Sequence, residues 1–477
     1  MIFVLLFFVL IDSFGNCQNR LTLEQQQNLE LYGLSVRRGD LTRVRALITN
    51  DDVKVDQTGF DEWLCRPWKL PNATAFVWAS GCRGIDNLAM MDLLRDLGAN
   101  ITARDQYGWS ALHIAAKDGR TDIARYLIGK GMEPDPRITH GSTPLMVAAN
   151  NDRNVTAIFL LDSGANVNAR DNTLWSPLIW AGRAGALSTA KILLDRGADV
   201  RARNNFGTNA LMLAANSDRL DTVELLLSYG ANPEWVDYDG WTPLIYAAKN
   251  GRTAATEKLL DNFANIEAFD RRGYRALHYA ANYGRTDTVR LLLQRGAFIE
   301  ATTNLGATPL ILAAPNNGTE TIRVLLDFGA NIEAKANDGG TVLMYASHNG
   351  RNDIILELLN RGANIGSRDI DQWSPLIYAC RFGQTSTAAF LLDKGSDIEE
   401  KDSDGWTPLM FAVLNGYTDT VEMLLRRGAN VEPRANDGKT ALQVAAEQEN
   451  LDMVRLLIRN GANKFRCGHL ICWSIYI

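Results

Sequence analysis

The sequence predicts an all-α solenoid in which one helix–turn–helix unit of 33 residues is stacked many times. A polar residue, most often Ser or Thr, recurs at every 33rd position from Ser110 to Thr440, in eleven copies without an insertion. Every copy has a leucine two residues later and an alanine five residues later. Most copies then have an apolar pair at helical spacing and a closing Gly-Ala. A fixed period of this length is typical of repeat architectures, whose units must stack to bury their apolar faces.

Each recurring residue has a physical role, which the stretch "DGWTPLIYAAKNGRT" illustrates. The hydroxyl of Thr242 is expected to cap a first helix by accepting from its early N–H groups. Pro243 fits the first helical position, where the missing N–H has no intrahelical partner to lose. Small alanines allow two antiparallel helices to approach closely, and the closing glycine supplies a left-handed C-cap.

The wording "TPLIYAAKNG" and "SALHIAAKDG" resembles the ankyrin repeat family, as do the period, the alanine pair and the final Gly-Ala. The resemblance implies an ankyrin-repeat solenoid of stacked helix–turn–helix units with short β-hairpin fingers. It also implies a non-enzymatic protein that binds other proteins.

The first segment, residues 1–17, is predicted to be a signal peptide. It begins with "MIFVLLFFVLI", eleven residues that are too few to cross a bilayer but typical of a signal-peptide core. No Lys or Arg precedes the apolar run, so a buried N-terminal helix or a misplaced start codon is the alternative. The prediction places the protein outside the cell or in the secretory-pathway lumen; the alternative location is the cytoplasm.

The rest of the chain falls into segments that match the repeat pattern to different degrees. Residues 25–104 read as two degenerate repeats with a long loop at 57–72, and residues 105–464 as eleven regular repeats. Residues 465–477 form a tail that fits no repeat. Within the regular array, Phe263 stands where the closing glycine is expected, and since a positive φ is unfavourable for Phe, an irregular turn is predicted there.

Composition and motifs give no indication of catalysis, of a cofactor or of nucleic-acid binding. The chain of 477 residues has a net charge of −6, which argues against a nucleic-acid partner, and no segment is long enough for a transmembrane span. No catalytic, phosphate-binding or metal-binding motif occurs, so we expect no enzyme activity, cofactor or metal. By the resemblance, His113 and His278 make structural hydrogen bonds.

The roles expected of the cysteines and of the glycosylation sequons depend on the compartment in which the protein resides. If the chain is secreted, Cys65 and Cys82 are the natural pair for a disulfide, whereas Cys380 replaces a core alanine. The sequence contains candidate glycosylation sites at Asn72, Asn100, Asn154 and Asn317, which are no more than the composition predicts.

Aromatic residues recur at two positions of the repeat. The residue before the cap is aromatic in six copies: Trp109, Trp175, Trp241, Tyr274, Trp373 and Trp406. The resemblance places this row on the fingers, facing the groove, where it either packs only or also contacts a partner. A second series, four residues after the cap, is predicted to be core: Trp180, Tyr246, Tyr279, Tyr345, Tyr378 and Phe411.

The predicted function is therefore a protein-binding scaffold that is exported and uses its concave face and finger tips. The alternatives are an intracellular adaptor with a false signal peptide, and a secreted effector or toxin-like component. The sequence does not name the partner.

Overall fold

The computed structural model describes residues 23–49, 53–54, 56, 74–81, 86–316 and 318–466. The predicted signal peptide, the loop 57–72 and tail residues 467–477 lie outside the described residues. So do Cys65, Cys82, Asn72 and Asn317.

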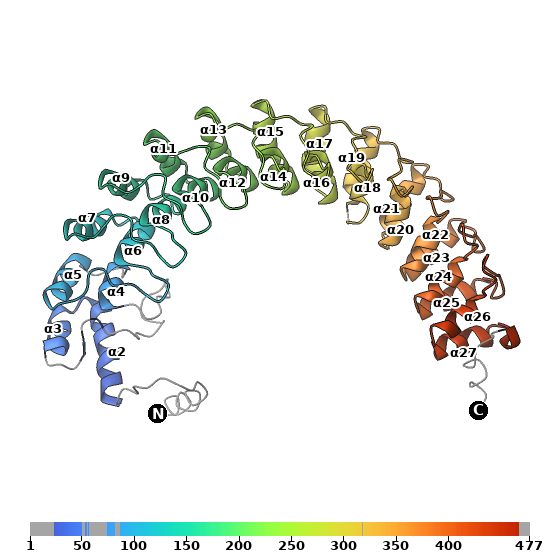
Figure 1. Ribbon diagram of the computed structural model, residues 1–477, viewed down its shortest axis with the longest axis horizontal. Coiled ribbons are helices and arrows are strands. Elements are labelled where there is room, and N and C mark those ends of the chain that lie inside the picture. Colours follow the sequence, from blue (N-terminus) through green and yellow to red (C-terminus); the bar gives the residue numbers. More distant parts are fainter. Residues whose placement is uncertain are drawn as a thin grey trace. The chain divides into compact units, whose positions relative to one another are not determined.

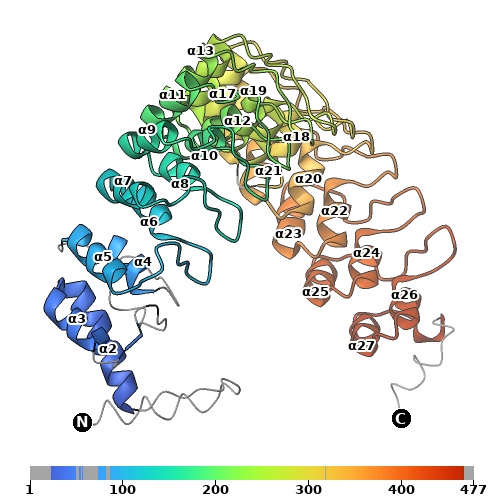
Figure 2. The ribbon, with the colours of Figure 1, turned by 60° about the vertical axis from the view of Figure 1, so that its left-hand side comes forward.

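The chain forms two compact units, Met1–Asn205 and Phe206–Ile477. Each unit is a stack of antiparallel helix pairs, with the even-numbered first helices in one layer and the odd-numbered second helices in the other (Figures 1 and 2). The helices of the first unit are α2 (Leu23–Arg38), α3 (Leu41–Thr49), α4 (Ala75–Gly81), α5 (Asn87–Asp96), α6 (Ala111–Asp118), α7 (Thr121–Gly129), α8 (Pro144–Asn150), α9 (Asn154–Asp162), α10 (Pro177–Ala184) and α11 (Leu187–Asp195). The helices of the second unit are α12 (Ala210–Asn216), α13 (Leu220–Ser228), α14 (Pro243–Lys249), α15 (Thr253–Asp261), α16 (Ala276–Asn282), α17 (Thr286–Gln294), α18 (Pro309–Ala313), α19 (Thr319–Asp327), α20 (Val342–His348), α21 (Asn352–Asn360), α22 (Pro375–Arg381), α23 (Thr385–Asp393), α24 (Pro408–Leu414), α25 (Thr418–Arg426), α26 (Ala441–Glu447), α27 (Leu451–Arg459) and the 3-10 helix η2 (Lys464–Arg466).

The first helices begin as the repeat pattern predicts. The hydroxyl oxygen of Thr242 accepts from the backbone N–H of Ile245 at 3.2 Å, and Pro243 is the first residue of α14. Asn209 performs the same capping with its amide oxygen, which accepts from Met212 N at 2.9 Å. A cap of this kind satisfies one of the early N–H groups that a helix leaves unpaired.

Short hairpin fingers connect one helix pair to the next. In the finger before α14, Asp237 N donates to Trp241 O at 3.1 Å and Gly240 N donates to Asp237 O at 3.2 Å. The following finger adds to it, since Arg271 N donates to Asp239 O at 3.2 Å. The described residues contain isolated antiparallel bridges in three fingers but no extended strand. The predicted all-α repeat solenoid is confirmed.

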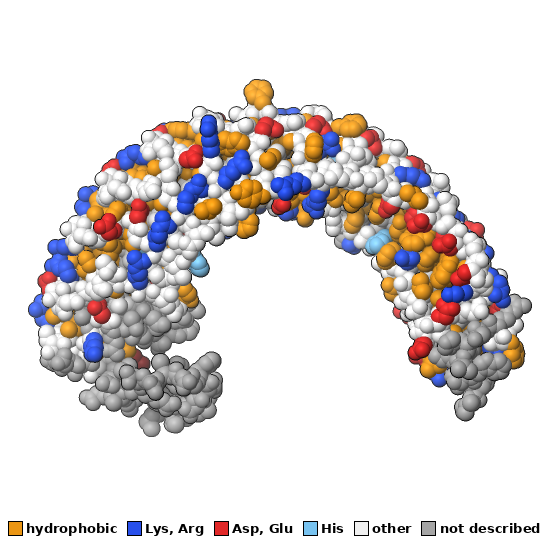
Figure 3. All heavy atoms as spheres, in the orientation of Figure 1, with side chains coloured by type: hydrophobic (Ala, Val, Ile, Leu, Met, Phe, Trp, Pro, Cys, Tyr) orange, Lys and Arg blue, Asp and Glu red, His pale blue; other side chains and the backbone are white. Residues whose placement is uncertain are grey.

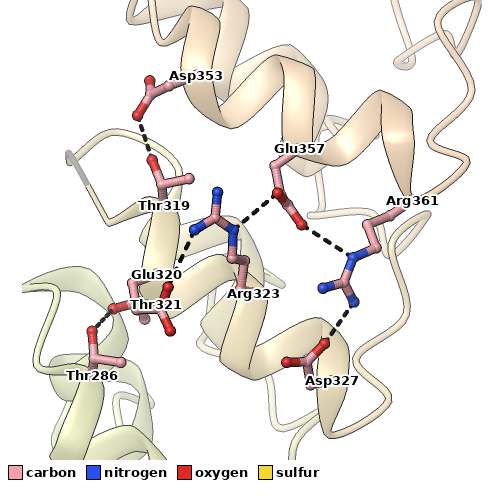
Figure 4. Close-up of polar contacts among 9 residues, drawn as sticks. All are labelled: Thr286, Thr319, Glu320, Thr321, Arg323, Asp327, Asp353, Glu357 and Arg361. Carbon is pink, nitrogen blue, oxygen red and sulfur yellow. Dashed lines mark hydrogen bonds and ion pairs between the residues drawn. The ribbon is translucent and has the colours of Figure 1, made fainter.

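Polar ladders along the second helices tie neighbouring repeats together (Figure 4). The guanidinium of Arg361 lies 2.7 Å from Asp327 of the preceding repeat and 3.1 Å from Glu357. Arg323 reaches Glu357 of the following repeat at 3.0 Å. These two arginines are therefore neutralised by carboxylates from the chain itself.

The prediction of an irregular turn at Phe263 was wrong. Phe263 adopts φ 64°, as glycine does at this position, and Ala264 N still donates to Leu259 O at 3.0 Å. The same bond joins Ala231 N to Leu226 O at 3.0 Å in the preceding repeat. Stacking on both sides fixes the turn, so the strain stays in the phenylalanine, whose side chain is 91% exposed.

Candidate partner-binding surface

The six aromatic residues of the predicted row all lie at the base of a finger, directly before a first helix. Each is half-buried. Trp241 packs on Tyr246 of its own repeat, with ring centroids 5.2 Å apart, and on Tyr279 of the next repeat, at 4.7 Å. Trp373 makes the same two kinds of contact with Tyr378 at 5.6 Å and Phe411 at 5.5 Å. Trp241 and Trp373 therefore brace neighbouring repeats, and every ring of the row remains partly in solvent. Whether the row contacts a partner stays a prediction.

Four of the tryptophans carry a cation, which the sequence analysis missed. The Lys or Arg lies eight residues after the tryptophan, at the end of the first helix. The distances from cation to ring centroid are 5.0 Å for Lys117 over Trp109, 5.6 Å for Arg183 over Trp175, 4.5 Å for Lys249 over Trp241 and 4.2 Å for Arg381 over Trp373. These are cation–π distances. The signal was present in the sequence as a Trp followed at this spacing by Lys or Arg in four of the eleven regular repeats.

The second aromatic series is core in only half of its members, so that prediction was partly wrong. Tyr279, Tyr378 and Phe411 are buried, with 3%, 8% and 4% exposure, whereas Trp180, Tyr246 and Tyr345 are half-buried.

The tyrosines of this second series hold the fingers in place. The hydroxyl of Tyr246 donates to Asp237 Oδ2 at 2.6 Å, and that of Tyr279 to Asp270 Oδ2 at 2.6 Å. The other carboxylate oxygen of each Asp accepts backbone N–H groups of the finger; Trp241 N donates to Asp237 Oδ1 at 2.8 Å. Burial, followed by the bond to Asp237, raises the pKa of Tyr246 well above its usual range, so the hydroxyl remains a donor. The finger that carries the tryptophan is thus fixed to the helix behind it.

His113 and His278 have the structural role that the resemblance implied. The Nδ1 atom of His278 accepts from Arg275 N at 3.0 Å, and Nε2 contacts Ala301 O at 2.9 Å. Both imidazoles are fully buried, and burial lowers the pKa of each to about 4. Cys380 is also a buried core residue, and this burial raises the pKa of its thiol.

Two candidate glycosylation sites lie among the described residues. Asn100 is exposed in the turn after α5, where its Oδ1 accepts from Thr102 N at 2.9 Å. Asn154 is exposed as the first residue of α9, while Thr156 of the same sequon is buried and bonded to Thr121 at 2.8 Å. Modification at either site stays a prediction.

The described residues hold no group of three metal-ligating side chains. Among the helices that the structure describes, none is long and apolar enough to cross a membrane.

Comparison with known proteins identifies the family. The profile of "Ankyrin repeats (3 copies)" matches in overlapping sections from residue 77 to residue 466, namely 77–171, 128–204, 159–237, 211–303, 299–369, 343–435 and 376–466. The chain belongs to the ankyrin-repeat family. The half-buried row therefore lies on ankyrin fingers, as the resemblance implied.

Curated relatives share parts of this ankyrin array. Protein phosphatase 1 regulatory subunit 27 of Mus musculus is 37% identical over 100 residues, which are 21% of this chain and 56% of that protein. The Notch-regulated ankyrin repeat-containing protein of Homo sapiens is 32% identical over 112 residues, 23% of this chain and 87% of that protein. The chain thus spans about half the length of the mouse phosphatase subunit. The crystal structure of the human ASB11 ankyrin repeat domain is 31% identical, covering 47% of this chain and 99% of that one, with a TM-score of 0.44.

Proposed function

We propose that this ankyrin-repeat protein is a non-enzymatic scaffold that holds a protein partner on its first helices and fingers, and that it is exported. The observation that carries the proposal is the row of half-buried aromatic rings fixed in equivalent positions by the stack. Rigid aromatics bury much area at little entropic cost, which is why they dominate binding hot spots. The named role of a relative, a regulatory subunit of protein phosphatase 1, supports action through another protein.

Binding is tested by selecting partners and then removing the rings. The biotinylated full chain is used to select binders from a displayed library of secreted and cell-surface protein domains. Selected domains are titrated against the Trp241→Ala/Trp373→Ala variant. Loss of two hot-spot rings should weaken binding by roughly tenfold or more.

A matched control tests whether the loss of binding is specific to the aromatic row or follows from the removal of any exposed ring. Phe263→Ala and Phe298→Ala remove two aromatics that are 91% and 59% exposed at turns of the second-helix layer, and we expect them to leave binding unchanged. Far-UV circular dichroism checks folding, and Trp241→Phe keeps a packing ring if the alanine variant unfolds. Equal affinity of the alanine variant, or lost helicity in every row variant including Trp241→Phe, would reject the row as a contact surface.

Export is proposed from the apolar run at residues 1–11 and the small residues that follow it. The full chain with a C-terminal tag is expressed in a eukaryotic secretory host, and its N-terminus is sequenced from medium and lysate. A product in the medium that begins near Asn16 or Gln18 and shifts on glycosidase treatment supports export. An uncleaved, unglycosylated product confined to the lysate contradicts it and directs the partner search to the cytosol.

A further inference from the structure

We infer that the first-helix side of the repeats containing α14 and α16 binds an extended acidic segment of the partner protein. The inference rests on the proposed function and names the chemistry of the partner. The surface consists of cationic and aromatic residues from two adjacent repeats of the second unit, and we call it the basic–aromatic surface: Trp241, Lys249, Arg271, Arg272, Tyr274 and Tyr283.

The aromatic rings of this surface form a connected layer. Trp241 and Tyr274 both pack on the buried Tyr279, with centroids 4.7 and 5.2 Å away. The ammonium of Lys249 lies 4.5 Å from the centroid of Trp241 and 5.5 Å from that of Tyr283. This Lys249 is therefore held above two rings from neighbouring repeats, with its N–H donors available at the surface.

The finger contributes the other cations. The guanidinium of Arg272 lies 5.0 Å from the centroid of Tyr274 and donates from Nη2 to the Tyr279 hydroxyl at 2.9 Å. Its side chain remains 67% exposed, and the distance to the buried Asp270 is 3.9 Å. Arg271, beside it, is exposed and has no carboxylate partner among the described residues. Figure 3 shows Lys and Arg side chains gathered over α14 and α16.

The charge of this surface is only partly neutralised by the chain itself. Lys249 and Arg271 form no ion pair with a described residue, Arg272 has only the long contact with Asp270, and the finger before α14 carries one exposed carboxylate, Asp239. On the second helices of the same repeats two cations are paired, although the exposed Arg290 of α17 has no ion pair with a described residue. There Lys258 pairs with Glu224 at 2.8 Å, and Arg295 pairs with Asp261 at 2.7 Å and with a second acid, Glu257, at 2.8 Å. In a chain of net charge −6, three cations without ion pairs of ordinary length form a local positive surface that attracts carboxylates.

The neighbouring fingers limit how long the ligand is. The tip position that Arg272 occupies is Asp in the finger before it and in the later fingers of the same unit: Asp239, Asp338, Asp371, Asp404 and Asp437, all exposed. A long polyanion such as nucleic acid or a sulfated polysaccharide would run from the cations onto these carboxylates and be repelled. A short acidic segment would cover the cations alone.

The spacing of the repeats sets how many residues an extended ligand needs to pass from one repeat to the next. Packed helices lie about 8–10 Å apart, and an extended chain rises about 3.3 Å per residue. An extended segment therefore advances by one repeat in about three residues, so that acidic residues of one short segment can face Lys249 of one repeat and Arg272 of the next. An apolar side chain between them would contact the exposed edges of Trp241 and Tyr274.

The experiment selects the ligand without assuming its sequence. A displayed library of random twelve-residue peptides is panned against the biotinylated full chain at low ionic strength, and the enriched peptides are sequenced. We expect Asp and Glu to be enriched over the naive library. Affinity should fall roughly tenfold for the Lys249→Gln/Arg271→Gln/Arg272→Gln variant, since three partly exposed charge pairs are lost.

The control variant removes the same number of charges elsewhere. Arg290, Lys394 and Arg459 are exposed on or beside second helices of the same unit, and their replacement by Gln should leave peptide affinity unchanged. Phosphatidylserine vesicles and heparin are tested in parallel with both variants.

The outcomes distinguish a failure of this inference from a failure of the proposed function. Enriched peptides without an acidic bias that still depend on Trp241 and Trp373 overturn this inference and leave the proposed function standing. Acidic peptides that bind the triple variant as well as the native chain also overturn it. Vesicle or heparin binding that requires the three cations, without acidic peptides, assigns the surface to a lipid or polysaccharide instead. Absence of any peptide or protein binder overturns both proposals.

Discussion

The two buried histidines should make the stability of the array depend on pH in a predictable direction. His113 caps α6, where Nδ1 accepts from Ser110 N at 3.3 Å and contacts the Ser110 hydroxyl at 2.8 Å. Its Nε2 lies 3.2 Å from Ser142 O of the next repeat. This pattern of one acceptor and one donor requires the neutral imidazole. Burial, as the main cause, lowers the pKa of His113 and of His278 to about 4.

The size of the effect follows from linkage. The pKa of histidine in an unfolded chain is about 6.5, so between pH 6.5 and 4 the unfolded state binds more protons than the folded state. The free energy of unfolding therefore falls as the pH falls through this range. For a folded pKa of about 4, the loss between pH 7 and pH 5 is about 1.8 kcal/mol for each histidine. The contribution of each neutral histidine to the free energy of unfolding is fully present above pH 6.5.

The chain itself offers a matched replacement. In the last repeat Gln443 occupies the position of His113, and its Oε1 accepts from Thr440 N at 2.9 Å. His113→Gln should keep the cap but lose the bond to Ser142 O, which costs about 1 kcal/mol. Because glutamine does not titrate, the variant should be less stable than the native chain at pH 7 and more stable at pH 5.

Hydrogen exchange measures this crossover locally, which is needed because long repeat arrays unfold in parts. The full chain and the variant are exchanged at pH 7 and pH 5, and protection is compared for peptides that cover α6 and α8. Nuclear magnetic resonance of 13C-labelled histidine gives the pKa values directly. The same ranking of the two proteins at both pH values, or a His113 ring that titrates above pH 6, would refute the reasoning.

Three further predictions concern single sites. Gly296→Ala should lower the free energy of unfolding by about 1 kcal/mol, because the residue has a positive φ. Gly306→Ala should lower it at least twice as much, because its added Cβ would also lie 2.7 Å from Asn337 N. Urea unfolding of both variants checks this difference. Phe263→Asn should raise stability by about 0.5 kcal/mol, since Asn tolerates φ 64° and the 91% exposed ring loses little contact; a less stable variant in the same assay would mean that the ring is packed. The buried Cys380 thiol should react with a maleimide only after urea unfolding, since burial raises its pKa and blocks access; mass spectrometry of the native chain detects any earlier reaction.

Local rules in the sequence predicted much of the fold because each repeat carries the same signals. The cap at Thr242, the proline after it and the buried Leu244 are consequences of residue type and spacing. The family resemblance then placed the aromatic row on the fingers and gave His113 and His278 their structural role. None of these inferences needed a contact between distant residues to be known.

Phe263 shows where local reasoning failed. Backbone preference predicted that this bulky residue would change its turn, yet the turn keeps the geometry of glycine. The preference is worth about 1–2 kcal/mol, and stacking of the repeats on both sides outweighs it. Tyr246 shows a second failure: it is half-buried although Tyr279, which makes the same bond to an Asp of its finger, is buried, so the position in the repeat does not by itself fix burial.

The sequence by itself determined the repeat, its period, its caps and the positions of the tryptophans, since these depend on residues within one repeat. Only the tertiary structure decided that Lys249 lies over Trp241 and Tyr283, and that Arg272 remains largely exposed while Arg295 is neutralised. The physical reason is that charge and exposure depend on which side chains of the next repeat come within a few ångströms. A periodic sequence specifies that repeats stack, but the contacts between their variable residues are made only when they do.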